Sequence, residues 1–185
     1  AAVRPEIVTE DVDRFYAVYD AAGGKPGAEQ LQRDYLDQGS DGLDEFAKIR
    51  RITGERIAIA IDKRPEMYVE ARQCAAVMPT VKARLTRALT KLRELYPQAN
   101  LPPVTLAIGR TKPVGTANAT AGVMIGLEAL CALDFLNPDI EDRFVSVIAH
   151  EYVHVQQPAA QIEEPDATVL EASLIEGGSE VVAEL

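Results

Sequence analysis

The sequence is poor in long apolar runs and in basic residues, and each scarcity excludes a class of function. No apolar run approaches the roughly 20 residues that a membrane-spanning helix needs, so no such helix is expected. Only 19 lysine and arginine residues stand against 29 acidic ones, which gives a net charge of −10. Nucleic acid and anionic membrane surfaces are therefore not expected partners, because binding to phosphate needs clustered positive charge. The short basic runs at residues 48–51 and 82–87 are expected to form solvated helix faces.

The sequence has only two cysteines, Cys74 and Cys131, and their spacing does not resemble a zinc knuckle. A single disulfide would suit an exported protein, and two inert buried thiols are the open alternative. The chain begins Ala1-Ala2 without methionine, which fits either a mature end after signal-peptide cleavage or an arbitrary boundary. We expect an exported protein, periplasmic or extracellular and with or without a lipid anchor, rather than a cytoplasmic one.

Breaker residues divide the first half of the chain into a series of helices. Apolar residues at helical spacing open the series at residues 9–22, and Gly23-Gly24 ends that helix. Further helices are expected at residues 28–37, 43–52, 55–63, 65–78 and 80–96. Pro65 and Pro79 fit first-turn positions, where a missing N–H costs nothing. Residues 1–98 are expected to form a helical region that packs on a core built by residues 99–185, in one compact unit.

The second half mixes strands with helices. Residues 104–110 and 121–128 are expected to be strands, joined by a loop rich in glycine, proline, threonine and asparagine. A helix then begins with Asn137 as N-cap and Pro138 in the first turn, and it ends before Pro158. A last helix begins near Asp166 and still continues at Leu185, so the natural chain is expected to extend further. The predicted fold class is α+β, mostly helical.

The only two histidines lie in one apolar segment, VIAHEYVHVQQ at residues 147–157. Apolar side chains surround His150, Glu151 and His154 on nearly every side, so this helix is expected to be buried. Burying unpaired imidazoles and a carboxylate costs on the order of several kcal/mol unless each group finds a partner. One metal ion would satisfy all three groups.

The spacing of these residues supports a metal site. Residues four apart lie on one helix face, so His150 and His154 can each direct a ring nitrogen at one ion about 2 Å away. Glu151 lies about 100° around the helix, which suits a residue that holds a water better than a third ligand. This is the HExxH pattern of the zincin metallopeptidases. The alternatives are a chance match, on the order of one in a few hundred chains of this length, and a structural cluster without metal.

The third ligand is sought by elimination. No third histidine exists, which excludes the zincins with an extended HExxHxxGxxH pattern. A carboxylate from a following helix is expected instead, as in the gluzincins. By analogy with the ExxxD-like pair of gluzincins, Glu176 is assigned to the metal and Glu180 to the orientation of a ligand histidine. Glu171 is the weaker rival, and an ordinary solvated acidic face is the alternative.

Two segments carry a resemblance to a known group. HEYVHVQQ and LIEGGSEVVAEL together resemble the predicted zinc-dependent gluzincin peptidases that include proteins related to gliding-motility lipoproteins, and EGGSE is similar to the ligand helix of zinc aminopeptidases. Gly177 and Gly178 fit a close approach of that helix to the HExxH helix. The similarity covers about residues 104–185. It implies a zincin-like core, in which a small sheet lies over the HExxH helix and a C-terminal helix supplies the last ligand.

The resemblance also implies a mechanism. His150, His154 and Glu176 would hold zinc and leave one position for a water whose pKa falls towards about 7. Glu151 would take the proton of this water as it attacks a peptide carbonyl, and would pass it to the leaving amine. Peptides or proteins would be the substrates.

Substrate contacts are less clearly marked. Zincins commonly align the peptide along an edge strand above the metal, and the glycines of residues 121–128 would permit a close backbone approach. The residues assigned to this strand are Gly122, Val123, Met124, Ile125 and Gly126. A plain core strand is the alternative. The donor that assists the tetrahedral intermediate is not assigned, because Tyr68, Arg72, Arg110 and groups beyond residue 185 are equal candidates.

Peptidase activity has a rival from another class, a zinc-stabilised binding or assembly module without turnover. The intact Glu151 favours hydrolysis, since a purely structural site has no need for a base. Zinc is the expected cofactor in both cases. No oligomeric state is predicted.

Overall fold

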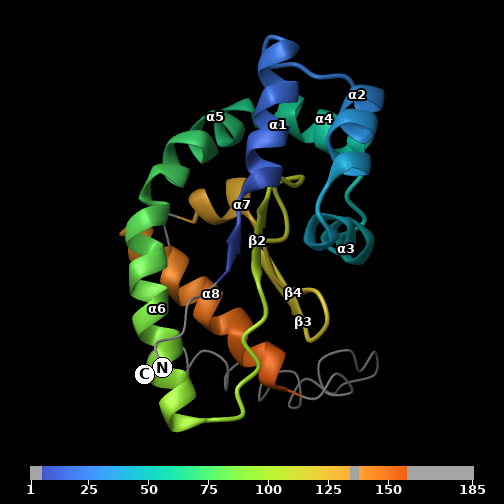
Figure 1. Ribbon diagram of the computed structural model, residues 1–185. Coiled ribbons are helices and arrows are strands. Elements are labelled where there is room, and N and C mark those ends of the chain that lie inside the picture. Colours follow the sequence, from blue (N-terminus) through green and yellow to red (C-terminus); the bar gives the residue numbers. More distant parts are fainter. Residues whose placement is uncertain (1–5, 134–137, 158–185) are drawn as a thin grey trace, which may run out of the picture.

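The computed structural model describes residues 6–133 and 138–157, and Figure 1 shows a small sheet among many helices. The predicted α+β class, mostly helical, is confirmed. The strands are β1 Ile7–Val8, β2 Val104–Ala107, β3 Gly115–Asn118 and β4 Gly122–Gly126. The helices are α1 Glu10–Ala21, α2 Ala28–Asp34, α3 Asp41–Arg50, α4 Gly54–Lys63, α5 Pro65–Cys74, α6 Met78–Leu95, α7 Leu127–Cys131 and α8 Ile140–Gln156, with short 3-10 turns at Leu36–Gln38 and Ala75–Val77.

The helices of the first half lie close to the ranges that apolar spacing and breaker residues predict. Ser40 accepts a hydrogen bond from the backbone N–H of Leu43 and so caps α3, and Thr53 caps α4 in the same way through Arg56. Proline stands in the first turn of α5 and of α6, as expected. The structure shifts several helix ends by a few residues, since α5 stops at Cys74 and a 3-10 turn leads into α6.

The sheet is mixed, with the strand order β1-β2-β4-β3. β1, β2 and β4 are parallel, whereas β3 runs antiparallel to β4 and forms one edge. Two of these strands were not predicted. β1 has only two residues, and β3 lies in the segment expected to be a loop, because its glycine, alanine and asparagine have low strand propensity and gain order by pairing with β4.

Two helices near the sheet, α7 and α8, begin differently from the prediction. The predicted strand at residues 121–128 ends at Gly126, and its last two residues already belong to α7. The N-cap of α8 is Asp139, whose side chain accepts from the N–H of Asp142 at 2.8 Å, and not Asn137. Asn137 itself lies outside the described residues. The acidic residue directly before the helix was the better cap because its carboxylate reaches the orphan N–H groups of the first turn.

The two faces of the sheet carry different helices. Thr105 of β2 faces α3, where a Cβ on Gly42 would meet its hydroxyl, and Met124 of β4 shares this face. The opposite face carries Ile125 and the backbone of Gly115, and α8 packs against it with α6 at its side (Figure 1). The HExxH helix therefore lies against the sheet at β3 and β4.

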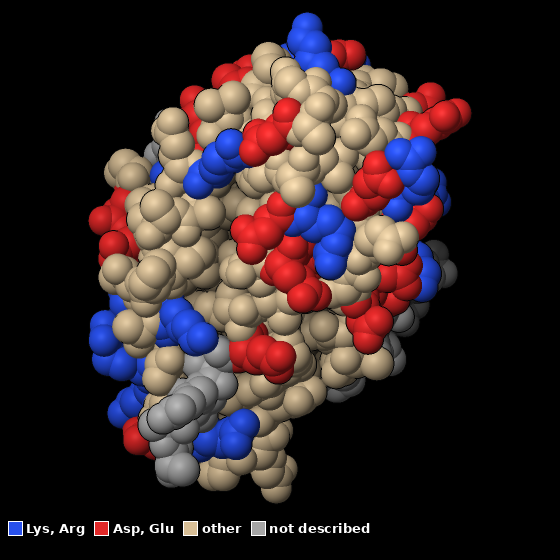
Figure 2. All heavy atoms as spheres, turned by 45° about the horizontal axis from the view of Figure 1, so that its top comes forward, with Lys and Arg blue, Asp and Glu red and all other residues tan. Residues whose placement is uncertain are grey.

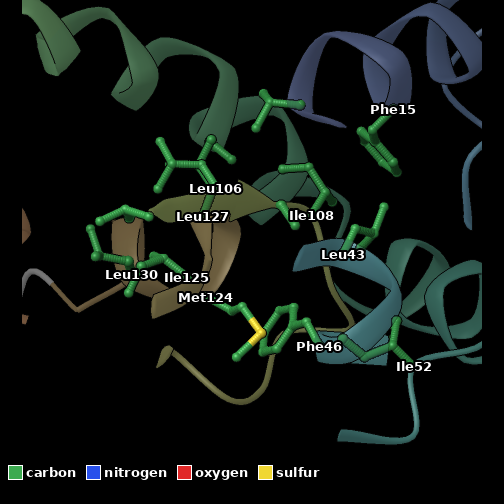
Figure 3. Close-up of a cluster of buried hydrophobic side chains, with 14 of the residues drawn as sticks. Phe15, Leu43, Phe46, Ile52, Leu106, Ile108, Met124, Ile125, Leu127 and Leu130 are labelled. Atoms are coloured by element: carbon green, nitrogen blue, oxygen red, sulfur yellow. The ribbon is translucent and has the colours of Figure 1, made fainter. Parts of the chain in front are cut away.

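A single hydrophobic cluster runs from α1 through the sheet to α8. In Figure 3, Phe46 of α3 lies beside Met124 of β4, and Phe15 of α1 lies on the side of Ile108, which follows β2. The four are essentially buried. The helices of the first half and the sheet thus share one core.

The surface of the described residues carries charges of both signs. Figure 2 shows acidic and basic side chains interspersed over the face that it presents. None of the described helices is long and apolar enough to cross a membrane.

Candidate metal centre

The helix α8 is held at several points along its length. Near its start, buried Arg143 donates to the backbone oxygens of Leu130 and Cys131 at the end of α7. Near its end, the hydroxyl of Tyr152 donates to the backbone oxygen of Pro102 at 2.6 Å, and Gln156 exchanges hydrogen bonds with the backbone of Asn100. These contacts fix both the position and the rotation of the helix that carries the histidines.

The two histidine side chains converge. The Nε2 atoms of His150 and His154 lie 3.0 Å apart, and the ring planes are inclined by 76°. A tetrahedral zinc ion about 2.0–2.1 Å from each nitrogen would hold them about 3.3 Å apart, so a shift of a few tenths of an ångström would admit the ion. The arrangement fits two ligands of one metal.

Gln157 was not recognised in the sequence as part of the site. Its side-chain oxygen lies 2.7 Å from Nδ1 of His154. This contact suits the tautomer in which Nδ1 donates to the amide oxygen, and in that tautomer the lone pair of the imidazole is on Nε2. A contact of this kind fixes the tautomer and ring orientation that a metal ligand needs. The available signal was its position three residues after His154, one turn further along.

The carboxylate of Glu151 lies over the edge of the sheet. A Cβ on Gly115 of β3 would come within 2.7 Å of its Oε1 atom, so only glycine leaves this carboxylate its present position. His150 and Glu151 together line a hollow of about 220 Å³. The other lining residues are Val114, Gly115, Leu133, Ser146 and Val147. The carboxylate of Glu151 thus borders a space that is large enough for water molecules.

The remaining predicted metal residues cannot be placed. Glu171, Glu176 and Glu180 lie outside the described residues. Within residues 6–133 and 138–157, no group of three histidine, cysteine or acidic side chains is arranged to hold a metal ion. The described part holds two of the three predicted ligands, His150 and His154, and the third, Glu176, lies outside it.

The prediction that residues 122–126 form the substrate-aligning edge is wrong. β4 is paired with β2 on one side and with β3 on the other, and it is buried along its whole length, so it has no open edge. Its glycines accommodate the chain itself, since a Cβ on Gly122 would lie 2.3 Å from the oxygen of Pro103, and one on Gly126 would lie 2.7 Å from that of Pro113. The edge beside Glu151 belongs to β3.

The three side chains considered as donors to the reaction are engaged in other contacts. Tyr68 donates to the backbone oxygen of Gly109. Arg72 pairs with Asp20, and its guanidinium lies over the ring of Tyr16. Arg110 donates to the backbone oxygen of Arg50.

Cys74 and Cys131 form a disulfide that joins α5 to α7. The sequence left this pairing open. Since Arg143 links the end of α7 to α8, the disulfide anchors the start of the HExxH helix to the helices of the first half.

Comparisons with protein-family models, curated proteins and solved structures found no significant match to the chain. The resemblance of HEYVH and EGGSE to the gluzincins is therefore still a prediction.

Proposed function

We propose that the chain is a zinc-dependent peptidase of the gluzincin type. The observation that carries the proposal is the convergence of the Nε2 atoms of His150 and His154, 3.0 Å apart, beside the Glu151 carboxylate at the mouth of a hollow. A buried structural cluster has no need for such a hollow. A base, by contrast, needs space for the water that it deprotonates.

The proposed ligand set is His150, His154 and Glu176. Gln157 supports His154 through Nδ1, so the role proposed for Glu180, to orient a ligand histidine, is assigned to His150. The mixed sheet, with an antiparallel edge strand beside the HExxH helix, supports a zincin-like core.

The chemistry divides between the ion and the protein. Zinc, when bound, supplies a Lewis acid that makes a water more acidic and polarises a carbonyl. Glu151 takes the proton from the water and delivers it to the leaving amine, and Gly115 keeps the space in which its carboxylate can turn. His150 and His154 direct their Nε2 atoms towards one point because they lie one turn apart on α8, and the contacts at both ends of the helix hold that face in place.

The substrate is a peptide that pairs with the outer edge of β3, which no other strand of the described residues covers. Strand addition would supply backbone hydrogen bonds without regard to sequence, while the hollow beside Glu151 would take one side chain. Val114, Leu133 and Val147 give this hollow a largely apolar wall, and its volume of about 220 Å³ fits a residue of the size of leucine or phenylalanine. Cleavage next to such residues is the expected preference.

The disulfide supports the further proposal that the protein acts outside the cytoplasm. Structural disulfides persist in oxidising compartments and are rare where thiol reductants are abundant. An exported peptidase fits both the disulfide and the site.

The test combines zinc content with cleavage of a broad peptide library, using the longest natural chain. Glu151→Gln should keep one zinc per chain and lose at least about 100-fold in kcat/KM, because proton transfer loses its base. The matched control is Glu94→Gln, an exposed glutamate on α6, which should cleave as the wild type does. Unchanged cleavage by Glu151→Gln would refute the mechanism. Zinc without any cleavage would favour the rival function, a binding or assembly module.

A further inference from the structure

A second hollow, of about 280 Å³, lies between α4 and the loop that follows β2. It is lined by Arg56, Ile59, Ala60, Lys63, Arg64, Arg110 and Thr111, and these residues are called the basic pocket below. Four of the seven are cations and none is an acid. In a chain of net charge −10, this local excess of positive charge is the reverse of the overall balance.

Hydrogen bonds hold the loop that carries Arg110 in place. The buried carboxylate of Glu128 accepts from the N–H of Gly109 at 3.0 Å and from the N–H of Thr111 at 2.9 Å, so it binds the residues on both sides of Arg110. The guanidinium of Arg110 also donates twice to the backbone oxygen of Arg50, at 3.1 and 3.3 Å. Arg110 is thus fixed at the wall of the basic pocket before any ligand arrives.

A second arginine is fixed in the same manner. Arg56 donates to the backbone oxygen of Arg51 at 2.9 Å, the carbonyl next to the one that holds Arg110. Backbone oxygens orient the two guanidiniums without a carboxylate to cancel their charge. Each guanidinium also has further N–H donors beyond those used here.

The remaining cations are at the rim. Arg64 forms an exposed ion pair with Glu66, which neutralises it in part. Among residues 6–133 and 138–157, Arg56, Lys63 and Arg110 have no carboxylate within ion-pair distance. Ile59 adds an apolar wall, since 45 % of its surface is exposed beside these cations.

We propose that the basic pocket is a binding site for a small organic phosphate. Three cations without an acidic partner in the described part of the chain favour a dianion over a single carboxylate, and the fork geometry of guanidinium groups matches phosphate oxygens. The exposed face of Ile59 is placed to contact the organic part. The site is independent of the proposed peptidase activity and shares none of the residues assigned to it.

Titration calorimetry at constant ionic strength tests the proposal with phenyl phosphate, inorganic phosphate and succinate as probes. Phenyl phosphate should bind saturably and several-fold more tightly than inorganic phosphate, because only the ester reaches Ile59. Lys63→Gln and Arg110→Lys should each weaken the binding of phenyl phosphate by roughly tenfold. The first variant loses a positive charge, and the second loses the planar pair of N–H donors that a guanidinium offers to phosphate oxygens.

The matched control is Lys91→Gln, which removes the same charge from an exposed position on α6 and should bind as the wild type does. Lys63 makes no hydrogen bond or ion pair among the described residues, so its replacement leaves the fold intact. Non-saturable binding, or wild-type affinity in both pocket variants, would overturn the proposal. Succinate that binds as tightly as phenyl phosphate would overturn the assignment to phosphate.

Discussion

Gly115 lies at the point where the edge strand β3 meets the carboxylate of Glu151. An added Cβ would lie 2.7 Å from Oε1 of Glu151 and 3.1 Å from the end of the Ile125 side chain. Both contacts are with the ends of flexible side chains, so the fold can adjust while the carboxylate must move. A single methyl group at this position therefore tests the geometry of the proposed base directly.

Gly115→Ala is expected to keep zinc and to lose activity. Displacement of a catalytic group by about 1 Å costs up to about 100-fold, so kcat/KM should fall by about tenfold to 100-fold while the thermal midpoint changes little. Gly27→Ala is the control, because a Cβ there meets nothing within 4 Å. Full activity in Gly115→Ala would show that the Glu151 carboxylate is not confined as described.

Glu128 is a buried carboxyl whose burial raises its pKa, and the two N–H donors from Gly109 and Thr111 offset this only in part. A raised pKa means that the folded protein binds the proton more tightly than the unfolded chain does. The resulting stabilisation is present below the unfolded-state pKa, near 4.5, and is lost as the pH rises through the folded-state value.

The free energy of unfolding of Glu128→Gln should therefore change differently with pH from that of the wild type. The amide does not titrate, so the advantage of the wild type over the variant should shrink as the pH rises from about 4.5 to 8. Urea unfolding at several pH values measures this difference. A difference between Glu128→Gln and the wild type that stays constant with pH would contradict the prediction.

At the scale of elements, contacts with neighbouring segments fix the position of the HExxH helix in the fold. Arg143 ties its start to α7, and Tyr152 and Gln156 tie its end to residues 100–102. The disulfide continues this chain of contacts from α7 to α5. Its two cysteines are 57 residues apart, a long loop whose closure restricts the unfolded chain strongly.

Loss of the disulfide is expected to destabilise the protein by up to about 4 kcal/mol, the value that loop-closure entropy gives for a loop of this length. The variant Cys74→Ser/Cys131→Ser should unfold at lower urea concentration than the wild type. Reductant should lower the stability of the wild type and leave that of the double variant unchanged. A double variant as stable as the oxidised wild type would show that the bridge does not form.

Several elements could be predicted from the sequence and several could not. The helices of the first half were predictable because apolar spacing, proline and cap residues all act within one or two turns. β3 was not, because its residues gain a strand conformation only by pairing with β4. The same holds for the edge position, which depends on strand order and was therefore assigned to the wrong strand.

At the scale of the whole molecule, a ligand that binds only the folded state stabilises all of it. Zinc at about 100 times its dissociation constant should raise the free energy of unfolding by about 2.7 kcal/mol. The stabilisation should vanish with a chelator and return on addition of zinc. A thermal midpoint that does not change when zinc is added to the longest natural chain would contradict the proposed centre.

Two neighbouring glutamines provide a matched pair for this measurement. Gln157→Ala should require about tenfold more zinc for the same stabilisation, because Nδ1 of His154 loses its acceptor. Gln156→Ala loses contacts with Asn100 instead and should lower the midpoint without changing the zinc dependence. Equal zinc dependence in both variants would exclude the role assigned to Gln157.

The sequence alone determined the mostly helical class, the positions of most helices and the placing of His150 and His154 one turn apart, because all of these depend on local spacing. Only the tertiary structure decided which strand forms the edge beside Glu151, that the cysteines pair, and that Arg110 joins the cations of α4 in one pocket. These features join residues through the packing of separate elements, and contacts across the fold leave no periodic trace in the chain.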